Sequence, residues 1–212
     1  MTVPPRRLGL LGGTFDPIHT GHLILASQAA ESLDLDEVLF IPAQVPPHKL
    51  GEKISPAVDR VAMVRSAIEG DARFVFSDLD LLSDTPSYTS ELVERISSES
   101  PGCELYFITG ADSLRDFPTW HQPQTILEHV YLAVAGRPGV EVTETMLDTV
   151  PTLRRRVRLF DVPLIDISST DIRNRARAGR CLKYLVPDAV ERYILESNLY
   201  GNPNEKGRVP CP

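Results

Sequence analysis

The stretch GGTFDPIHTGH, residues 12–22, combines residue types that suit the binding of a phosphate group. Its leading Gly12 and Gly13 predict a tight turn that a ligand can approach closely, because glycine has no Cβ atom. A helix that begins beside them would present free N–H groups to an anion. His19 and His22 are three residues apart and can project to the same side of that helix. The alternative is a plain glycine turn followed by two exposed histidines.

A second stretch, ISSTDIRNRARAGR at residues 167–180, repeats this design near the other end of the chain. Ser168, Ser169 and Thr170 are favourable helix N-caps after an apolar lead. Arg173 then falls in the first helical turn, where its guanidinium can bind phosphate through two hydrogen bonds. Taken alone, the stretch favours an ordinary capped helix with a basic exposed face.

The elements that would position these stretches alternate along the chain. Strands are predicted over the apolar runs 8–11, 38–41, 74–77, 105–109, 130–135 and 157–161. Helices are predicted over 23–32, 58–69, 87–98, 113–117 (extending onward less clearly) and 144–148. Such alternation predicts an α/β fold, a Rossmann-like, doubly wound and mostly parallel sheet with helices on both faces. Ligands bind such sheets at the carboxyl ends of the strands. We expect a single domain over residues 1–200 and a flexible tail over 201–212.

Composition and spacing exclude several classes of protein. The stretch 12–22 has the spacing of neither a P-loop nor a GxGxxG fingerprint, and a zinc site would need a third ligand. The net charge of −7 argues against broad binding to nucleic acid, despite the basic run 154–158, which is typical of a solvated edge. No apolar run approaches the ~18 residues of a membrane span, and we expect no membrane partner.

The expected compartment is the cytoplasm. The apolar stretch among the first residues is too short for a signal peptide, and glycines interrupt it. Cys103, Cys181 and Cys211 lack the paired spacing of a zinc site or a disulfide framework, which favours reduced cysteines.

The two stretches together resemble the signature pair of the nucleotidyltransferase superfamily with the HxGH motif. Within it, the chain is similar to the bacterial nicotinate-nucleotide adenylyltransferases, through IPAQVPPHK, TPSYT, ITGADSL, TWH, GRPG and the ending YLVPDAVERYILESNLY. The resemblance implies that ATP and nicotinate mononucleotide give nicotinate adenine dinucleotide and pyrophosphate, in NAD biosynthesis. The phosphate of the mononucleotide would attack the α-phosphate of ATP directly. Mg²⁺ would be bound with ATP, without a dedicated set of protein ligands.

The resemblance also implies roles for individual residues. The catalytic residues would be His19, His22 and Arg173. The ATP-binding residues would be Gly12, Gly13, Thr14 and Phe15 along the triphosphate, Ser169 beside Arg173 at the β and γ phosphates, Gly110 and Asp112 at the ribose, and Arg137 and Ile167 at the adenine. The acceptor mononucleotide would contact His48, Lys49, Thr89, Trp120 and His121.

Other functions stay open at this point. A phosphopantetheine adenylyltransferase or a cytidylyltransferase shares the HxGH motif, but the former lacks PSYT and the TW pair. A regulatory domain that has lost catalysis need not keep His19, His22, Lys49 and Arg173. His121 stands where the family often has tyrosine, so substrate preference depends on whether the backbone or the ring makes the contact there. The sequence does not decide the oligomeric state, and a homo-oligomer is one of the alternatives.

Overall fold

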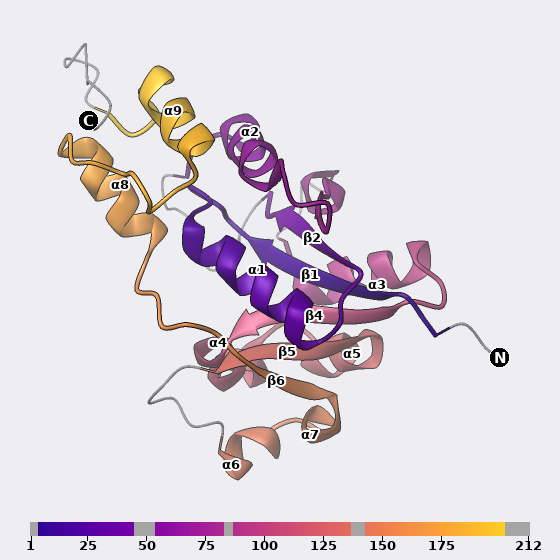
Figure 1. Ribbon diagram of the computed structural model, residues 1–212. Helices are drawn as coiled ribbons and strands as arrows, with labels where there is room; N and C mark the ends of the chain where they lie inside the picture. The colour runs from indigo at the N-terminus through magenta and orange to yellow at the C-terminus, as the bar shows by residue number, and fades with distance from the viewer. Residues whose placement is uncertain (1–3, 45–53, 83–86, 137–142, 202–212) are drawn as a thin grey trace.

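The computed structural model describes residues 4–44, 54–82, 87–136 and 143–201 (Figure 1). Six strands form one sheet in the order β3-β2-β1-β4-β5-β6, and every neighbouring pair is parallel. The strands are β1 (Arg7–Gly13), β2 (Glu37–Pro42), β3 (Phe74–Phe76), β4 (Glu104–Gly110), β5 (Val130–Gly136) and β6 (Val157–Asp161). Each predicted strand is confirmed, and so is the doubly wound α/β class.

The observed helices agree less closely than the strands with the ranges predicted from the sequence. They are α1 (Thr20–Ser32), α2 (Ala57–Ile68), α3 (Thr89–Glu99), α4 (Ala111–Asp116), α5 (Pro123–His129), α6 (Glu144–Leu147), α7 (Leu153–Arg156), α8 (Ser169–Arg177) and α9 (Asp188–Glu196), with 3₁₀ turns at Leu79–Leu82 and Phe117–Thr119. The onward extension after residue 117 is the 3₁₀ turn and then α5. The basic run predicted as a solvated edge contributes most of the short α7.

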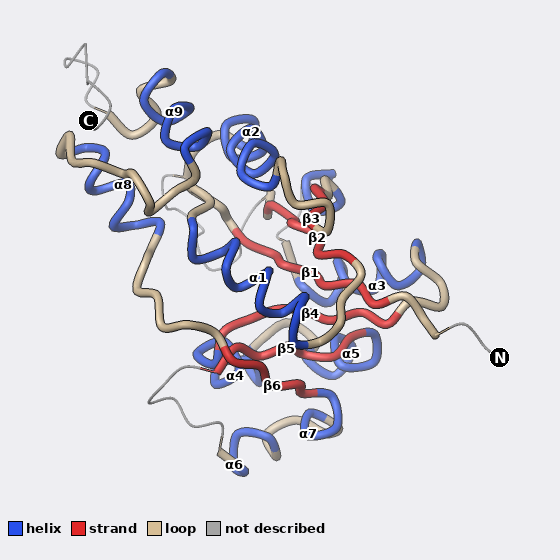
Figure 2. The backbone as a smooth tube through the Cα atoms, in the orientation of Figure 1, coloured by secondary structure: helices blue, strands red, loops and turns tan. Residues whose placement is uncertain are grey.

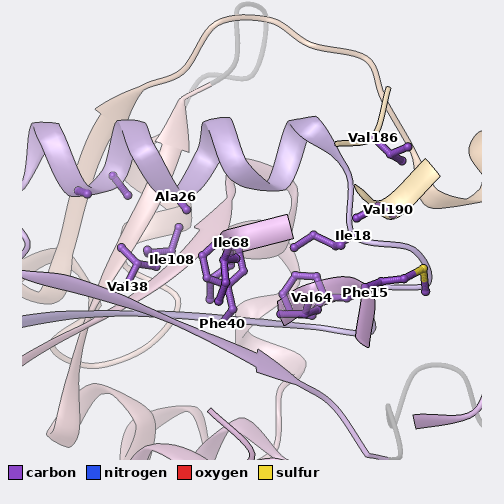
Figure 3. Close-up of a cluster of buried hydrophobic side chains, with 14 of the residues drawn as sticks. Phe15, Ile18, Ala26, Val38, Phe40, Val64, Ile68, Ile108, Val186 and Val190 are labelled. Carbon is purple, nitrogen blue, oxygen red and sulfur yellow. The ribbon is translucent and has the colours of Figure 1, made fainter. Parts of the chain in front are cut away.

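Helices cover both faces of the sheet (Figures 1 and 2). Alternate residues of β4 point to opposite faces, as a strand requires. Leu105 and Phe107 pack with α3, α4 and α5, whereas Tyr106 and Ile108 pack with α1, α2, α8 and α9. Figure 3 shows this second cluster, in which Ile108 and Phe40 lie between α1 and the strands. Both faces are therefore buried, which explains why the strands read as continuous apolar runs.

The strand order reverses between β1 and β4, because the chain winds outward to β3 and then returns to the other side of β1. In doubly wound sheets the crevice at such a reversal is the usual ligand site. Both strands end in glycine at their carboxyl ends, β1 at Gly13 and β4 at Gly110. The fold thus places the first signature stretch at the expected crevice.

Two further findings concern the chain as a whole. Cys103 is a free cysteine, as predicted, and Cys211 lies outside the described residues. Among the described residues, no helix is long and apolar enough to cross a membrane. Of the predicted tail, only Gly201 is described.

Candidate active site

The first signature stretch leaves the sheet without a glycine turn. Gly12 and Gly13 belong to β1, and neither has a positive φ; the left-handed residue is Phe15, with φ 50°. A Cβ atom on Gly13 would lie 3.1 Å from the Phe15 ring, which is 2% exposed. The prediction of a glycine-dependent turn is therefore wrong. Gly13 makes room for the buried ring of Phe15, and the backbone strain falls on Phe15 itself.

His19 and His22 project to the same side, as the spacing predicted. His19 is the N-cap of α1, and its backbone N–H donates to Nδ1 of His22 over 3.2 Å. The two imidazole rings stack with centroids 3.6 Å apart and planes at 23°. Because Nδ1 of His22 accepts a hydrogen bond, a neutral His22 carries its proton on Nε2, where it can donate to a ligand.

The helix start offers fewer free N–H groups than predicted. The N–H of Thr20 donates to the carbonyl of Leu185 over 2.9 Å, and that of His22 donates to the carbonyl of His19 over 2.9 Å. The chain before α9 crosses the start of α1 and takes up the first donor, a contact that only the tertiary structure shows. The start of α1 therefore offers an anion fewer backbone donors than the sequence predicted.

His19 is buried and neutral. Its side chain is 7% exposed, and burial lowers its pKa from the ordinary 6.5 to about 4. Its Nδ1 is buried and has no hydrogen-bond partner among the described residues. Gly21 makes this burial possible, because a Cβ atom there would lie 3.1 Å from that nitrogen. In the HTGH segment, Gly21 thus has a steric role beside the two histidines, which its residue type alone did not reveal.

The second signature stretch lies against the first. Ser168 is the N-cap of α8 and accepts from the N–H of Asp171 over 3.1 Å, so Arg173 lies in the second turn and not in the first as predicted. Arg173 Nη1 donates to the carbonyl of Asp16 over 2.7 Å. Ser169 Oγ donates to the carbonyl of Pro17 over 2.9 Å. These side chains hold residues 14–17, which we call the 14–17 loop.

A buried polar cluster beneath the 14–17 loop escaped the sequence predictions. The Asp16 side chain accepts from the hydroxyl of Tyr200 over 2.7 Å and from the N–H of Ser55 over 3.1 Å. Asp16 is 3% exposed and Tyr200 is 6% exposed. Burial raises the pKa of Tyr200, and its hydrogen bond to Asp16 adds to the rise. Tyr200, near the end of the described chain, therefore holds the loop that follows the first strand.

Arg60 of α2 completes this cluster and is 2% exposed. Its Nη1 donates to the carbonyls of Thr14 and Ala43 over 2.9 and 2.7 Å, and its Nε donates to that of Ser55 over 3.1 Å. Burial lowers the pKa of Arg60, and the charge of Asp16 opposes that shift. One sequence signal could have found it: Arg60 is spaced by three and four residues from the buried Met63 and Val64, on the apolar face of α2.

A cavity of about 500 Å³ opens at the carboxyl ends of β1, β2 and β4. It brings together residues predicted for two different substrates: Gly12, Gly13 and Thr14 for ATP, and Thr89, Trp120 and His121 for the acceptor. The lining does not include the remaining predicted residues that the structure describes, namely Phe15, His19, His22, Gly110, Asp112, Ile167, Ser169 and Arg173. His48, Lys49 and Arg137 lie outside the described residues.

The residues outside the lining lie close to the signature stretches or at the end of β4. The side chain of Ile167 would lie 3.9 Å from a Cβ atom on Gly21, which places the start of the second stretch beside HTGH. Gly110 is the N-cap of α4, and Asp112 lies in its first turn. Asp112 is exposed and lies 3.7 Å from Arg115.

Aromatic side chains form one side of the cavity, and we call Tyr88, Trp120 and His121 the aromatic wall. Trp120 meets the ring of Phe107 edge-on at 5.8 Å and that of Phe117 at 5.4 Å, so it both lines the cavity and packs on the core. His121 stacks on Tyr88 with centroids 4.3 Å apart. The aromatic wall thus contributes three ring systems to the lining of the cavity.

Asp80 is a further lining residue that the sequence did not single out. Its carboxyl accepts from the side chain of Ser87 and from the backbone of Gln44, and burial raises its pKa. Asp80 thereby joins the segment after β2 to the segment before α3. Within the described part of the chain, His, Cys, Asp and Glu side chains nowhere form a group of three or more that could hold a metal ion.

Known proteins are similar to this chain in sequence and in fold. Residues 10–175 match the sequence profile of the Cytidylyltransferase-like family. A "Probable nicotinate-nucleotide adenylyltransferase" of Thermomicrobium roseum is 48% identical over 195 residues, which cover 92% of this chain and 91% of that protein. A protein of the same name from Thermus thermophilus is 46% identical over 194 residues, covering 92% of this chain and 99% of that protein. This chain belongs to the nicotinate-nucleotide adenylyltransferase family.

The fold of this adenylyltransferase also matches solved structures. The nicotinic acid mononucleotide adenylyltransferase of Plasmodium falciparum, complexed with NaAD, aligns with a TM-score of 0.77 over 92% of this chain and 97% of that chain. Its sequence is 19% identical, so the match concerns the fold alone. The relatives from Thermomicrobium roseum and Thermus thermophilus confirm the resemblance drawn from GGTFDPIHTGH and ISSTDIR.

Proposed function

We propose that this chain joins ATP and nicotinate mononucleotide to give nicotinate adenine dinucleotide and pyrophosphate, the activity for which its relatives are named. The observation that supports the proposal is the cavity, whose lining contains both Gly12, Gly13 and Thr14 and Thr89, Trp120 and His121. A phosphate oxygen of the mononucleotide forms a bond to the α-phosphorus of ATP, and the bond from that phosphorus to the bridging oxygen breaks. Holding two reactants in line in this way can supply roughly 7–11 kcal/mol of the barrier.

On the ATP side, the 14–17 loop and the two histidines would meet the developing charge. His22 donates from Nε2 to a phosphate oxygen, and the neutral His19 lies stacked beneath it. Arg173 adds a permanent positive charge beside the loop and, with the backbone N–H of Ser169 at the start of α8, clamps the β and γ phosphates, since the Ser169 hydroxyl already donates to Pro17. The backbone of residues 12–15 follows the triphosphate. Preorganised donors of this kind stabilise charge in the transition state more than in the ground state.

The nucleoside of ATP would lie beyond the loop. Gly110 and Asp112, at the end of β4, bind the ribose, because a carboxylate accepts from hydroxyl groups. Ile167, with Arg137 from outside the described residues, flanks the adenine. Mg²⁺ enters with ATP as part of the substrate, and the cytoplasm is the compartment that fits this reaction.

On the acceptor side, Trp120 stacks on the pyridine ring, and His48 and Lys49 supply positive charge near the mononucleotide phosphate. The backbone N–H groups of Thr89 and His121 read the substituent of the ring. Two donors suit a carboxylate, which only accepts, whereas an amide would leave one donor unpaired. A buried unpaired donor costs ~1–3 kcal/mol. We therefore expect the site to prefer nicotinate mononucleotide, the acid, over nicotinamide mononucleotide, the amide.

The test compares kcat/KM for nicotinate mononucleotide, nicotinamide mononucleotide and phosphopantetheine at saturating ATP, by release of pyrophosphate. We expect the acid to exceed the amide by ~10²-fold or more, since 1.4 kcal/mol is a factor of about ten. Activity on phosphopantetheine alone would refute the proposed function. A ratio near one for the two mononucleotides would show that the ring substituent is not read by these donors.

A further inference from the structure

The side chain of His121 joins the two segments that form the aromatic wall. Its Nδ1 lies 3.1 Å from Oγ of Ser90, within hydrogen-bond distance. Its ring stacks on that of Tyr88, with an angle of 27° between the planes. Ser90 is 1% exposed, and it lies in the first turn of α3, which packs against α5. The hydroxyl that anchors His121 is therefore held in the interior.

These contacts hold the backbone on both sides of the cavity. Tyr88 and Ser90 flank Thr89, so a side chain that contacts both of them also holds Thr89. Thr89 is the first residue of α3, and its N–H has no acceptor within that helix. On the other segment, the N–H of Trp120 donates to the carbonyl of Phe117 over 3.0 Å, which fixes the turn that leads to His121. The ring of His121 bridges these two anchored segments.

We propose that the His121 side chain is a specificity-determining positioning residue. It sets the spacing between the N–H donors of Thr89 and His121, and thereby the preference for nicotinate over nicotinamide mononucleotide. This inference rests on the proposed function. A carboxylate presents two equivalent acceptors at a set separation, whereas an amide presents one acceptor, so only the acid depends on both donors at once. The hydrogen bond to Ser90 and the stacking on Tyr88 limit movement of the ring in different directions.

The experiment measures the ratio of kcat/KM for the two mononucleotides in the full chain and in matched variants. His121→Phe keeps a ring to stack on Tyr88 but removes Nδ1, and Ser90→Ala removes the hydroxyl from the other side. Each should lower the ratio about tenfold, the factor that corresponds to one hydrogen bond of ordinary strength. The double variant should be no lower than either single variant, because all three remove the same bond. His129→Ala, at the end of α5 and outside the cavity lining, should keep the ratio of the unmodified chain.

A ratio of two rate constants does not depend on how much of the enzyme is folded, so a loss of stability cannot imitate the effect. The inference is wrong if His121→Phe and Ser90→Ala both keep the ratio of the unmodified chain. It is equally wrong if that chain shows no preference to begin with. An unmodified chain that uses neither mononucleotide would overturn the proposed function itself, and the inference with it.

Discussion

Buried charge and hydrogen bonds hold the 14–17 loop, whereas aromatic rings hold the opposite side of the cavity. Arg60 and Arg173 donate to backbone carbonyls of the loop, and the Asp16 side chain is bonded to Tyr200. In the aromatic wall, Trp120 contacts its neighbours edge-on or tilted. There, one hydrogen bond joins the ring of His121 to α3.

The difference follows from what each region must do. Under the proposed function, the 14–17 loop holds the phosphates that react, and small displacements there cost rate. A network of buried charges suits this task, because it is stable only when every partner is in place. Stacked rings keep most of their contact area when they shift slightly, so they suit the admission and selection of a flat ring. We therefore expect the loop to tolerate substitution less well than the wall.

The largest effect should come from Arg60→Met. This change leaves the carbonyls of Thr14, Ala43 and Ser55 without a donor and the Asp16 carboxylate without its buried countercharge. We expect a loss of about 3 kcal/mol or more in the free energy of unfolding, because each buried acceptor left without its donor costs about 1–3 kcal/mol and this change affects three of them. Urea unfolding measures it.

The matched control is Arg65→Met on the exposed side of the same helix, where the guanidinium lies 3.9 Å from the centre of the Phe76 ring. It should cost about 1 kcal/mol or less. Equal losses in the two variants would mean that the buried network holds the loop no better than a surface contact would.

His22→Ala should act on the chemical step. A group that meets charge only as it develops contributes to the transition state, and losing one such donor typically lowers kcat by ~10²–10³-fold. The KM for ATP should change little. Steady-state kinetics, with thermal unfolding as a check of integrity, measures this. A raised KM at unchanged kcat would assign His22 to binding alone.

His19 should make stability depend on pH. Its pKa is lowered by burial to about 4 in the folded chain, from an ordinary 6.5, so the unfolded chain binds the extra proton between these values. The contribution of His19 to the free energy of unfolding should therefore be complete above pH 6.5. The free energy of unfolding should fall by about 3 kcal/mol as the pH drops toward 4. Comparing urea unfolding of the unmodified chain and His19→Asn across this range isolates the contribution. Parallel curves would show that His19 is not the group responsible.

Trp120→Ala should have the smallest effect. Stacking on an aromatic ring contributes ~0.5–1.5 kcal/mol beyond area burial, so KM for the mononucleotide should rise several-fold while KM for ATP is spared. Trp120→Phe should recover part of the loss. Because Trp120 also packs on Phe107 and Phe117, thermal unfolding must be followed in parallel. A collapse of stability with an unchanged KM would make Trp120 a packing residue only.

The sequence by itself determined the sheet. Strands buried on both faces appear as unbroken apolar runs, and all of these were found within about two residues of their ends. The helices α7 and α9 were not predicted, and α5 was predicted only as an unclear extension of the helix at 113–117. The helices α5 and α7 are short, and α5 begins after Gln122, whose positive φ of 49° has no sequence signature. Periodicity needs length, and these elements have little of it.

The signature motifs could also be identified in the sequence. A spacing of three residues predicts that His19 and His22 lie on the same side of the helix. What only the tertiary structure decided is which residues hold them. Tyr200 lies 184 residues from Asp16, and Arg173 lies 157 residues from it, yet each is bonded to it. The same holds for His121 and Ser90: Ser90 belongs to α3, whereas His121 lies between the 3₁₀ turn Phe117–Thr119 and α5. Such pairs leave no local pattern, since they form only when packing of the sheet and its helices closes the long loops between them.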